Sequence, residues 1–412
     1  MQLKKLGFLA IAAAMCMPLG AQENKENKDK ENEGYVFTTV KECKITPVKN
    51  QANAGTCWCY SGLGFIEAEL LRMGKGEYDF SEMYIVHHTY MDRAMAAVRT
   101  HGDVSFSQGG SFYDVIYGMS HYGLVPDNVM PAGAMYGDTL SNHSELSALT
   151  DACIEAITKG KVKKFQTDTA GNMLWYKALQ SIHDTYLGSY PEKFTYKGVS
   201  YTPESFYKSL GLNPDDYISL TSYTHHPFYE KFVIEIQDNW RWGLSYNLPL
   251  DEFMEVFDYA IDNGYPIAWG SDVSEEGFRK GVRQGFCVLP DFDAKDDGSL
   301  GSDMSHWTGL SKADKQKEAY EHPTPQKWVT QKERQIAYDN WETTDDHGMV
   351  IYGKAKDQMG NEYYMVKNSW GKYGKYDGMF YASKAFVRYK TMNILVHKDG
   401  IPKDLKKKLG IK

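Results

Sequence analysis

The chain has 412 residues, of which 42% are hydrophobic, 14% aromatic and 24% charged. This composition is typical of a folded globular protein and excludes a wholly disordered or fibrous chain. The formal net charge of −8 argues against general binding to nucleic acid, because such binding needs a basic surface. No run of about 18 apolar residues occurs beyond the N-terminus, so we expect no membrane span in the mature protein.

The first 21 residues have the pattern of a secretory signal peptide. Two lysines precede an apolar stretch over residues 6–17, and small residues follow it. Residues 22–34 are mostly charged and polar, so we expect a disordered linker before a folded domain at 35–412. The protein is therefore predicted to be exported, to the periplasm or out of the cell. Cys16 leaves anchoring as a lipoprotein as the alternative.

The first part of the expected domain is helical. Apolar residues recur at helical spacing, and the predicted helices cover residues 57–73, 81–98 and 111–122. The stretch 139–245 is polar and rich in aromatic residues, and its pattern does not define a topology.

The last part of the chain turns to strands. An amphipathic helix at 251–263 precedes a buried strand at 265–269. Two further strands, 348–355 and 362–368, flank a turn, and a short helix or strand edge follows at 383–390. Helices first and strands later predict an α+β protein of two subdomains with a cleft between them.

Cys57 is the strongest candidate nucleophile. It lies at the start of the first predicted helix, where free N–H groups and a positive partial charge stabilise a thiolate. Cys59 points to another face of that helix and is expected in the core. Five cysteines remain once Cys16 is removed with the signal peptide, so at least one thiol stays unpaired even if disulfides form.

The C-terminal hairpin supplies a base for this thiol. If its turn centres between residues 358 and 359, the numbers of paired residues sum to 717, and Asn368 lies opposite Met349. His347 is then a diagonal neighbour on the same face, roughly 7–8 Å away at the backbone. The Asn368 oxygen can accept from one ring N–H and leave the other nitrogen for the thiol. A register slip of one residue would break this inference.

Gln51 is the candidate for stabilising an oxyanion. It lies six residues before Cys57, and its amide can donate together with the Cys57 backbone N–H to a carbonyl under attack.

These residues lie in motifs that resemble the papain-like cysteine peptidases. The active-site segment reads ITPVKNQANAGTCW over residues 45–58, the histidine motif is HG at 347–348, and the asparagine motif is NSWG at 368–371. QGG at 108–110 resembles the family's glycine pair, which lets a substrate backbone lie extended against the enzyme. The motifs occur in the family's order.

The distance between the motifs points to one branch of that family. Cys57 and His347 are 290 residues apart, against about 130–150 in short members. Further blocks resemble bleomycin hydrolase and aminopeptidase C: SEMY at 81–84, YGLVP at 122–126, YNLPLDEF at 246–253 and NGYPIAWG at 263–270. The resemblance implies a papain-like fold with a large insertion, about 139–245, between the cysteine and the histidine.

The resemblance also implies a role for each residue. Cys57 and His347 would form a thiolate–imidazolium pair, Asn368 would orient the imidazole and Trp370 would shield that contact. Asp346 would tune the pair electrostatically. The remaining predicted site residues are Gln51 at the oxyanion and Gly109 and Gly110 along the substrate backbone. The expected reaction is hydrolysis of peptide bonds through an acyl-enzyme.

Two family properties bear on specificity and assembly. Members are typically hexamers with internal active sites, and the carboxylate of a C-terminal arm holds the free N-terminus of the substrate. The tail here ends in DGIPKDLKKKLGIK and lacks the longer arm of the family. We therefore expect an exported aminopeptidase, for which the resemblance implies a homohexamer. The alternatives are an endopeptidase, an enzyme that transfers the acyl group to an amine, and a catalytically inactive binding protein.

No cofactor or metal is predicted. The chain has no phosphate-binding loop, no dinucleotide fingerprint and no His-Glu-x-x-His motif. The adjacent pairs His87-His88 and His225-His226 cannot both face one ion from a regular helix.

Overall fold

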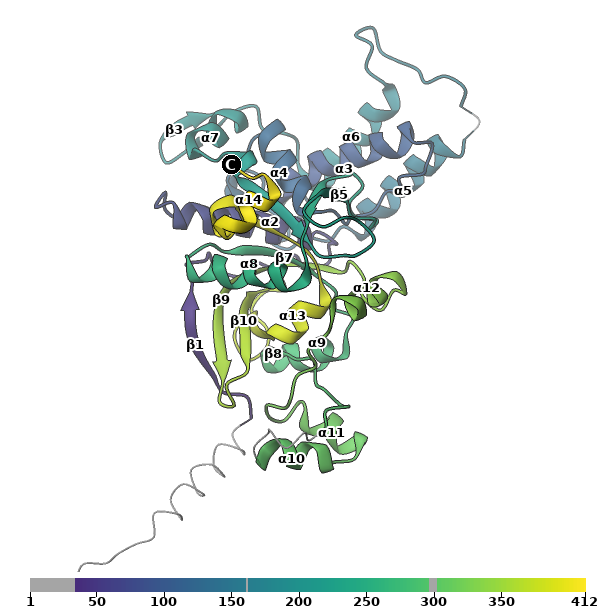
Figure 1. Ribbon diagram of the computed structural model, residues 1–412. Helices are drawn as coiled ribbons and strands as arrows, with labels where there is room; N and C mark the ends of the chain where they lie inside the picture. The colour runs from purple at the N-terminus through teal and green to yellow at the C-terminus, as the bar shows by residue number, and fades with distance from the viewer. Residues whose placement is uncertain (1–33, 161, 296–301) are drawn as a thin grey trace, which may run out of the picture.

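The computed structural model describes residues 34–160, 162–295 and 302–412 (Figure 1). The predicted signal peptide at 1–21 and all but the last residue of the predicted linker lie outside these ranges, so export stays a prediction. No helix within the described ranges is long and apolar enough to cross a membrane.

Helices dominate the first half of the domain, as expected. They are α2 (Cys57–Arg72), α3 (Glu82–Arg99), α4 (Phe112–His121), α5 (Ser144–Thr158), α6 (Leu174–Leu187) and α7 (Pro203–Leu210). The first three confirm the predicted helices to within a residue or two. Ser81 caps α3 by accepting from the Tyr84 N–H, and Ser111 starts α4 with a capping box.

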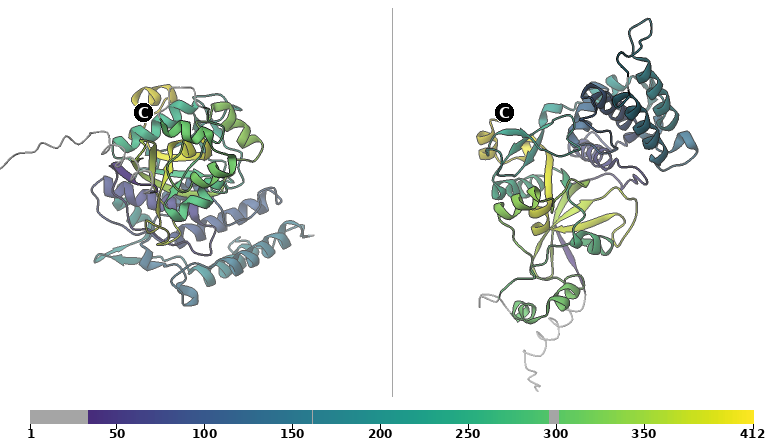
Figure 2. Two further views of the ribbon diagram at one scale, coloured as in Figure 1. Left: turned by 90° about the horizontal axis from the view of Figure 1, so that it is seen from below. Right: turned by 90° about the vertical axis from the view of Figure 1, so that its right-hand side faces the viewer.

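A ten-stranded mixed sheet occupies the other half (Figures 1 and 2). Its strand order is β5-β6-β4-β12-β7-β9-β10-β11-β8, and β1 pairs with the far part of β9. The strands are β1 (Phe37–Glu42), β4 (Tyr217–Thr221), β5 (Lys231–Val233), β6 (Leu244–Asn247), β7 (Ile267–Ser271), β8 (Phe286–Cys287), β9 (His347–Asp357), β10 (Glu362–Lys367), β11 (Met379–Ser383) and β12 (Thr391–His397). A separate hairpin consists of β2 (Phe194–Tyr196) and β3 (Val199–Tyr201).

The remaining helices follow in the second part of the chain, and α10 and α11 lie beyond one end of the sheet (Figure 1). They are α8 (Leu250–Asp262), α9 (Glu276–Gly281), α10 (Ser302–Gly309), α11 (Lys312–Glu318), α12 (Gln331–Asp339), α13 (Lys384–Lys390) and α14 (Lys403–Leu409). The predicted helix at 251–263 is confirmed as α8, and the undecided segment at 383–390 is the helix α13.

Two hydrophobic cores lie on opposite faces of the central strands. On β9, Met349 and Ile351 belong to the core shared with α8 and α13, whereas Val350 belongs to the helical core around α2. Successive side chains of a strand point to opposite faces, so a strand covered on both sides contributes alternate residues to two cores. Helix α2 packs against β9 and is buried along nearly its whole length, so its first turn is fixed relative to the sheet.

The predicted insertion, 139–245, contributes more than an appended lobe. Its helices α5 and α6 gather on the helical side, which Figure 2 shows in blue and teal. Its strands β4, β5 and β6 join the main sheet, where β4 pairs with β12. These strands follow the first-half helices, in agreement with the expected division of the chain, but the sequence pattern did not define their topology. The partner of β4 lies far away in sequence, and local patterns do not reveal such a pairing.

The register of the C-terminal hairpin agrees with the prediction where it matters. Near the turn the paired numbers sum to 718, as for Met365 and Gly353. A bulge at Tyr352 then shifts the pairing, so that Val366 lies opposite Ile351 and the sum becomes 717. The expected register therefore holds at the end of the hairpin that carries the histidine and the asparagine.

The C-terminal segment lies away from the first turn of α2. In α14, Leu405 and Leu409 are buried, and Lys408 pairs with Glu252 of α8 at 2.7 Å. Just before α14 the chain packs against Tyr265, whose ring lies 4.3 Å from the guanidinium carbon of Arg72. Arg72 ends α2, about 22 Å along the helix axis from Cys57. Figure 1 places the C-terminus beside α14.

Candidate active site

Cys57 is the first residue of α2, and its side chain is half-buried. The residue before it, Thr56, makes no side-chain cap, and the first turn carries no acidic residue. The free N–H groups of this turn therefore face the thiol without a competing anion. Cys59 is fully buried, as predicted, and every cysteine that the structure describes is free.

The start of β9 lies directly against this turn. A Cβ added at Gly348 would lie 2.5 Å from Oγ of Ser61 and 3.4 Å from Cα of Trp58, so only glycine allows this approach. The predicted pair of His347 and Cys57 is thus brought together at the contact of β9 with α2. No hydrogen bond links the sulfur directly to the imidazole among the described residues, and such bonds are often long before substrate binds.

Burial controls the protonation of both groups. It raises the pKa of the Cys57 thiol to about 12, the backbone N–H groups of Gly348 and Trp58 oppose this rise, and the carboxyl groups of Asp345 and Asp238 add to it. Burial also lowers the pKa of His347 to about 4. Burial therefore favours the neutral form of both groups.

Asn368 determines the tautomer of that ring. Its Oδ1 lies 2.7 Å from Nε2 of His347 and also accepts the backbone N–H of Ser369 at 2.8 Å. Because this oxygen can only accept, Nε2 carries the proton and Nδ1 is left as the free base. The contact expected from the hairpin register is present.

Trp370 covers this contact. Its ring centroid lies 4.8 Å from that of His347, at an angle of 32°, and Phe278 packs edge-on against its other side at 5.9 Å. The indole therefore shields the bond between His347 and Asn368 from water, which strengthens it.

Gln51 is held beside the asparagine motif. Its Oε1 accepts from Oγ of Ser369 at 2.6 Å, and its backbone N–H donates to the Ser369 carbonyl at 2.8 Å. One side-chain N–H donates to the carbonyl of Ala54 at 2.8 Å, which leaves the second amide hydrogen for a ligand.

The glycine pair lies next to Cys57. Gln108 Oε1 accepts the Gly55 N–H at 2.8 Å, and its carbonyl accepts Nε1–H of Trp58 at 3.0 Å. A Cβ added at Gly110 would meet the Trp58 ring at 2.9 Å, and one at Gly109 would overlap the carboxylate of Asp238. Asp238 therefore lies over the glycine that is predicted to contact the substrate, although it belongs to none of the motifs in the sequence.

Asp346 is directed away from the predicted pair. Its Oδ2 accepts the backbone N–H groups of Val273 and Ser274, and Oδ1 accepts from Thr344 at 2.7 Å. The neighbouring Asp345, together with Asp238, raises the pKa of the thiol instead. Successive side chains of an extended chain point to opposite faces, so Asp345 lies on the same face as His347 and Asp346 on the other. The two-residue spacing between Asp345 and His347 could have indicated this from the sequence.

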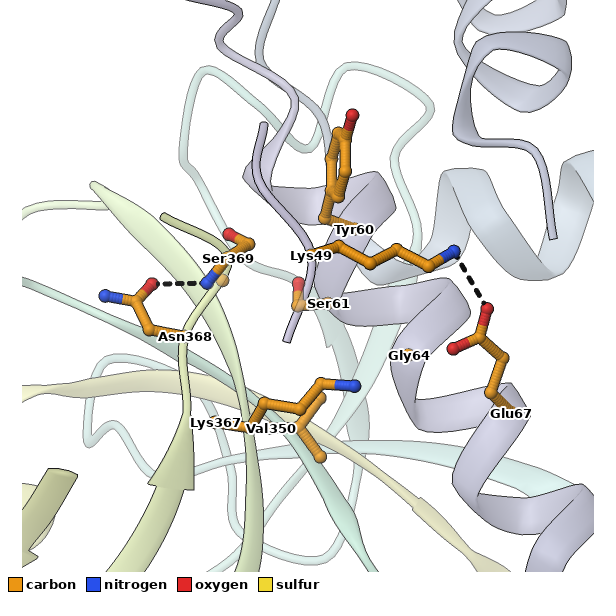
Figure 3. Close-up of a pocket in the computed structure, with 10 residues that line it drawn as sticks. Lys49, Tyr60, Ser61, Gly64, Glu67, Val350, Lys367, Asn368 and Ser369 are labelled. Carbon is orange, nitrogen blue, oxygen red and sulfur yellow. Dashed lines mark hydrogen bonds and ion pairs between the residues drawn. The ribbon is translucent and has the colours of Figure 1, made fainter. Parts of the chain in front are cut away.

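A small internal cavity of about 10 Å³ lies behind the site, between α2 and the strands β9 and β10 (Figure 3). Ser61, Asn368 and Ser369 line one part of it. On another part, Lys49 lies 3.0 Å from Glu67 of α2, and it also pairs with Asp79 and Glu82. This ion cluster fixes the segment that leads to Gln51.

One histidine cluster contradicts the reasoning used against a metal. His225 and His226 lie in a bend rather than a helix, and their Nε2 atoms lie 3.0 and 2.8 Å from the two oxygens of Glu235. All three ligand atoms lie within 4.8 Å of one another. Gln335, whose Oε1 accepts the Thr224 N–H, donates to Nδ1 of His225, so Nε2 of His225 carries a proton and donates to Glu235. The hydrogen bonds thus account for the cluster without an ion.

Comparison with known proteins defines the class. The chain matches the Peptidase C1-like family over residues 4–322 and 298–411. It is 23% identical to aminopeptidase G from Lactobacillus delbrueckii subsp. lactis over 90% of this chain and 84% of that protein. It is 24% identical to aminopeptidase C from Lactococcus lactis subsp. cremoris over 86% of this chain and 81% of that protein.

A solved structure agrees in fold. PepW from Lactobacillus rhamnosis superposes with a TM-score of 0.63 at 20% identity, covering 94% of this chain and 87% of that one. The chain therefore belongs to the Peptidase C1-like family of cysteine peptidases. The predicted resemblance to aminopeptidase C is confirmed, as is the α+β class.

Proposed function

We propose that the protein is a cysteine aminopeptidase of papain-like, two-subdomain architecture that removes residues from the N-terminus of peptides. The contact of Asn368 with His347, beside the helix end that carries Cys57, is the observation on which the proposal rests. Relatives named aminopeptidase C and G support the exopeptidase assignment over an endopeptidase.

The geometry suggests how the reaction proceeds. Nδ1 of His347 takes the Cys57 proton as Sγ attacks the carbonyl carbon of the first peptide bond. The second amide hydrogen of Gln51 and the Cys57 backbone N–H donate to the oxyanion. The imidazolium then protonates the leaving amine, which gives an acyl-enzyme. Water, deprotonated by His347, releases the acid and restores the thiol.

The test compares one substrate in two forms. Alanyl-aminomethylcoumarin should be hydrolysed by the full chain and not by Cys57→Ala, whereas Cys153→Ala, which alters a half-buried cysteine on α5, should keep full activity. The N-acetylated substrate should resist cleavage. Equal cleavage of both forms would instead indicate an endopeptidase, and unchanged turnover by Cys57→Ala would refute the nucleophile.

A further inference from the structure

An aminopeptidase must recognise the α-ammonium group of its substrate, and a carboxylate is the natural partner for that cation. Helix α14 packs beside α8 at the far end of α2 from Cys57, so it contributes no group near the thiol. Acidic side chains near the thiol are the candidates that the described residues offer.

Asp238 is placed for this task by contacts on three sides. Its Oδ1 lies 3.4 Å from Nη1 of Arg93 and 3.4 Å from Oγ of Ser107. Arg93 is almost fully buried and also donates to the Gly109 carbonyl at 2.7 Å, so the carboxylate and the glycine are held together. Oδ2 has no partner among the described residues. It lies where a Cβ on Gly109 would be.

Asp345 is the second acidic residue that acts on the thiol. It stands two residues before His347, where the chain enters β9. No hydrogen bond or ion pair is found for its half-buried carboxyl group within the described ranges, in contrast to Asp346, which has three donors. A half-buried carboxyl group without a partner is costly to the fold, which is typical of groups kept for a ligand.

The two carboxyl groups act on each other and on the thiol. Burial, then Asp238, then Asp346 raise the pKa of Asp345, to about 8. Burial likewise raises the pKa of Asp238, although Arg93 and Ser107 oppose the rise. Both carboxyl groups raise the pKa of Cys57. A cation bound among them would relieve this repulsion, and no lysine or arginine other than Arg93 pairs with either group in the described chain.

We propose that Asp238 and Asp345 bind the α-ammonium group of the substrate and so restrict cleavage to the N-terminal residue. The inference rests on the proposed aminopeptidase function and assigns its specificity to two side chains. Because Asp238 also occupies the space over Gly109, a substrate chain extending beyond one residue on that side would collide with it.

The ammonium group can be removed from the substrate without adding bulk. Alanyl-aminomethylcoumarin and its desamino analogue propionyl-aminomethylcoumarin differ only in that group. We expect Asp238→Asn and Asp345→Asn each to lower the alanyl-to-propionyl ratio of kcat/KM by about 10- to 100-fold, mainly through KM for the alanyl substrate, since charge-assisted hydrogen bonds are lost. Propionyl turnover supplies the reference rate within each variant, and circular dichroism checks that the variants are folded.

Asp404→Asn on the exposed face of α14 is the matched control, because it makes the same chemical substitution far from Cys57 and should leave the ratio unchanged. A ratio that stays within twofold in both test variants would overturn the ammonium site while leaving the peptidase intact. A failure of the aminopeptidase proposal would give a different result. The wild-type protein would then show no preference for the alanyl substrate, or no hydrolysis that depends on Cys57.

Discussion

Oδ1 of Asn368 lies 2.7 Å from Nε2 of His347, and the same oxygen accepts the Ser369 N–H. Through this second bond the backbone orients the carboxamide, and the carboxamide in turn orients the ring. The backbone hydrogen bond of Ser369, just after β10, therefore helps to keep Nδ1 of His347 unprotonated.

Asn368→Ala should lower kcat by on the order of 10- to 100-fold, because the imidazole loses its orientation and its preferred tautomer. Steady-state kinetics with the alanyl substrate measures the loss. Asn361→Ala, in the turn of the same hairpin, should change kcat little, because Asn361 bonds only to Asp357. A full-rate Asn368→Ala enzyme would show that the ring does not need this partner.

Gly348→Ala adds only one methyl group, but we expect it to impair activity strongly. The added methyl group would lie 2.5 Å from Oγ of Ser61 and close to the backbone of α2, so β9 must move away and carry His347 with it. We expect a destabilisation of about 1–3 kcal/mol together with a large fall in kcat/KM. Gly309→Ala, where nothing lies within 4 Å, is the control, and equal behaviour of the two variants in denaturation and rate assays would contradict the packing argument.

The pH profile should have its acid limb near pH 4. Burial lowers the pKa of His347 to about 4, so the ring stays a neutral base well below its usual value of 6.5. Measurement of kcat/KM between pH 3 and 8, with circular dichroism to exclude unfolding, tests this. An acid limb near 6.5 would mean that the ring is solvated in solution.

Asp345→Asn should stabilise the protein at alkaline pH although it weakens substrate binding. The folded-state pKa of Asp345 is raised to about 8, so its favourable contribution exists below about pH 4 and is lost as the pH rises through 8. Removing the charge should therefore raise Tm at pH 9 and leave it unchanged at pH 4. The gain is on the order of 1–3 kcal/mol, less than the full shift, because solvent reaches part of the group. A lower Tm at pH 9 would argue for a structural role.

Lys49→Met should destabilise the fold by about 3–5 kcal/mol, because it leaves the buried carboxylates of Glu67 and Glu82 without their cation. Chemical denaturation gives the value. Lys159→Met, whose pair with Glu155 is fully exposed, should leave the stability nearly unchanged. Similar losses in the two variants would show that the cluster around Lys49 is solvated.

Local patterns determined much of this protein. Apolar spacing and capping residues located α2, α3 and α4, because those signals act within a few turns of chain. Turn position and strand period placed His347 beside Asn368, although the bulge at Tyr352 was needed to restore that register.

Only the tertiary structure decided where the acidic groups and the insertion strands lie. Strand β4 pairs with β12, which lies far later in the chain, and β6 and β5 extend the sheet outward from β4. Asp238 likewise reaches Gly109 across 129 residues. Such contacts depend on long-range packing, which no local period encodes. Likewise, the tail sequence gave no sign that α14 would bury Leu405 and Leu409 against the sheet core, because that choice depends on the apolar surface that the distant helix α8 and its neighbours leave uncovered.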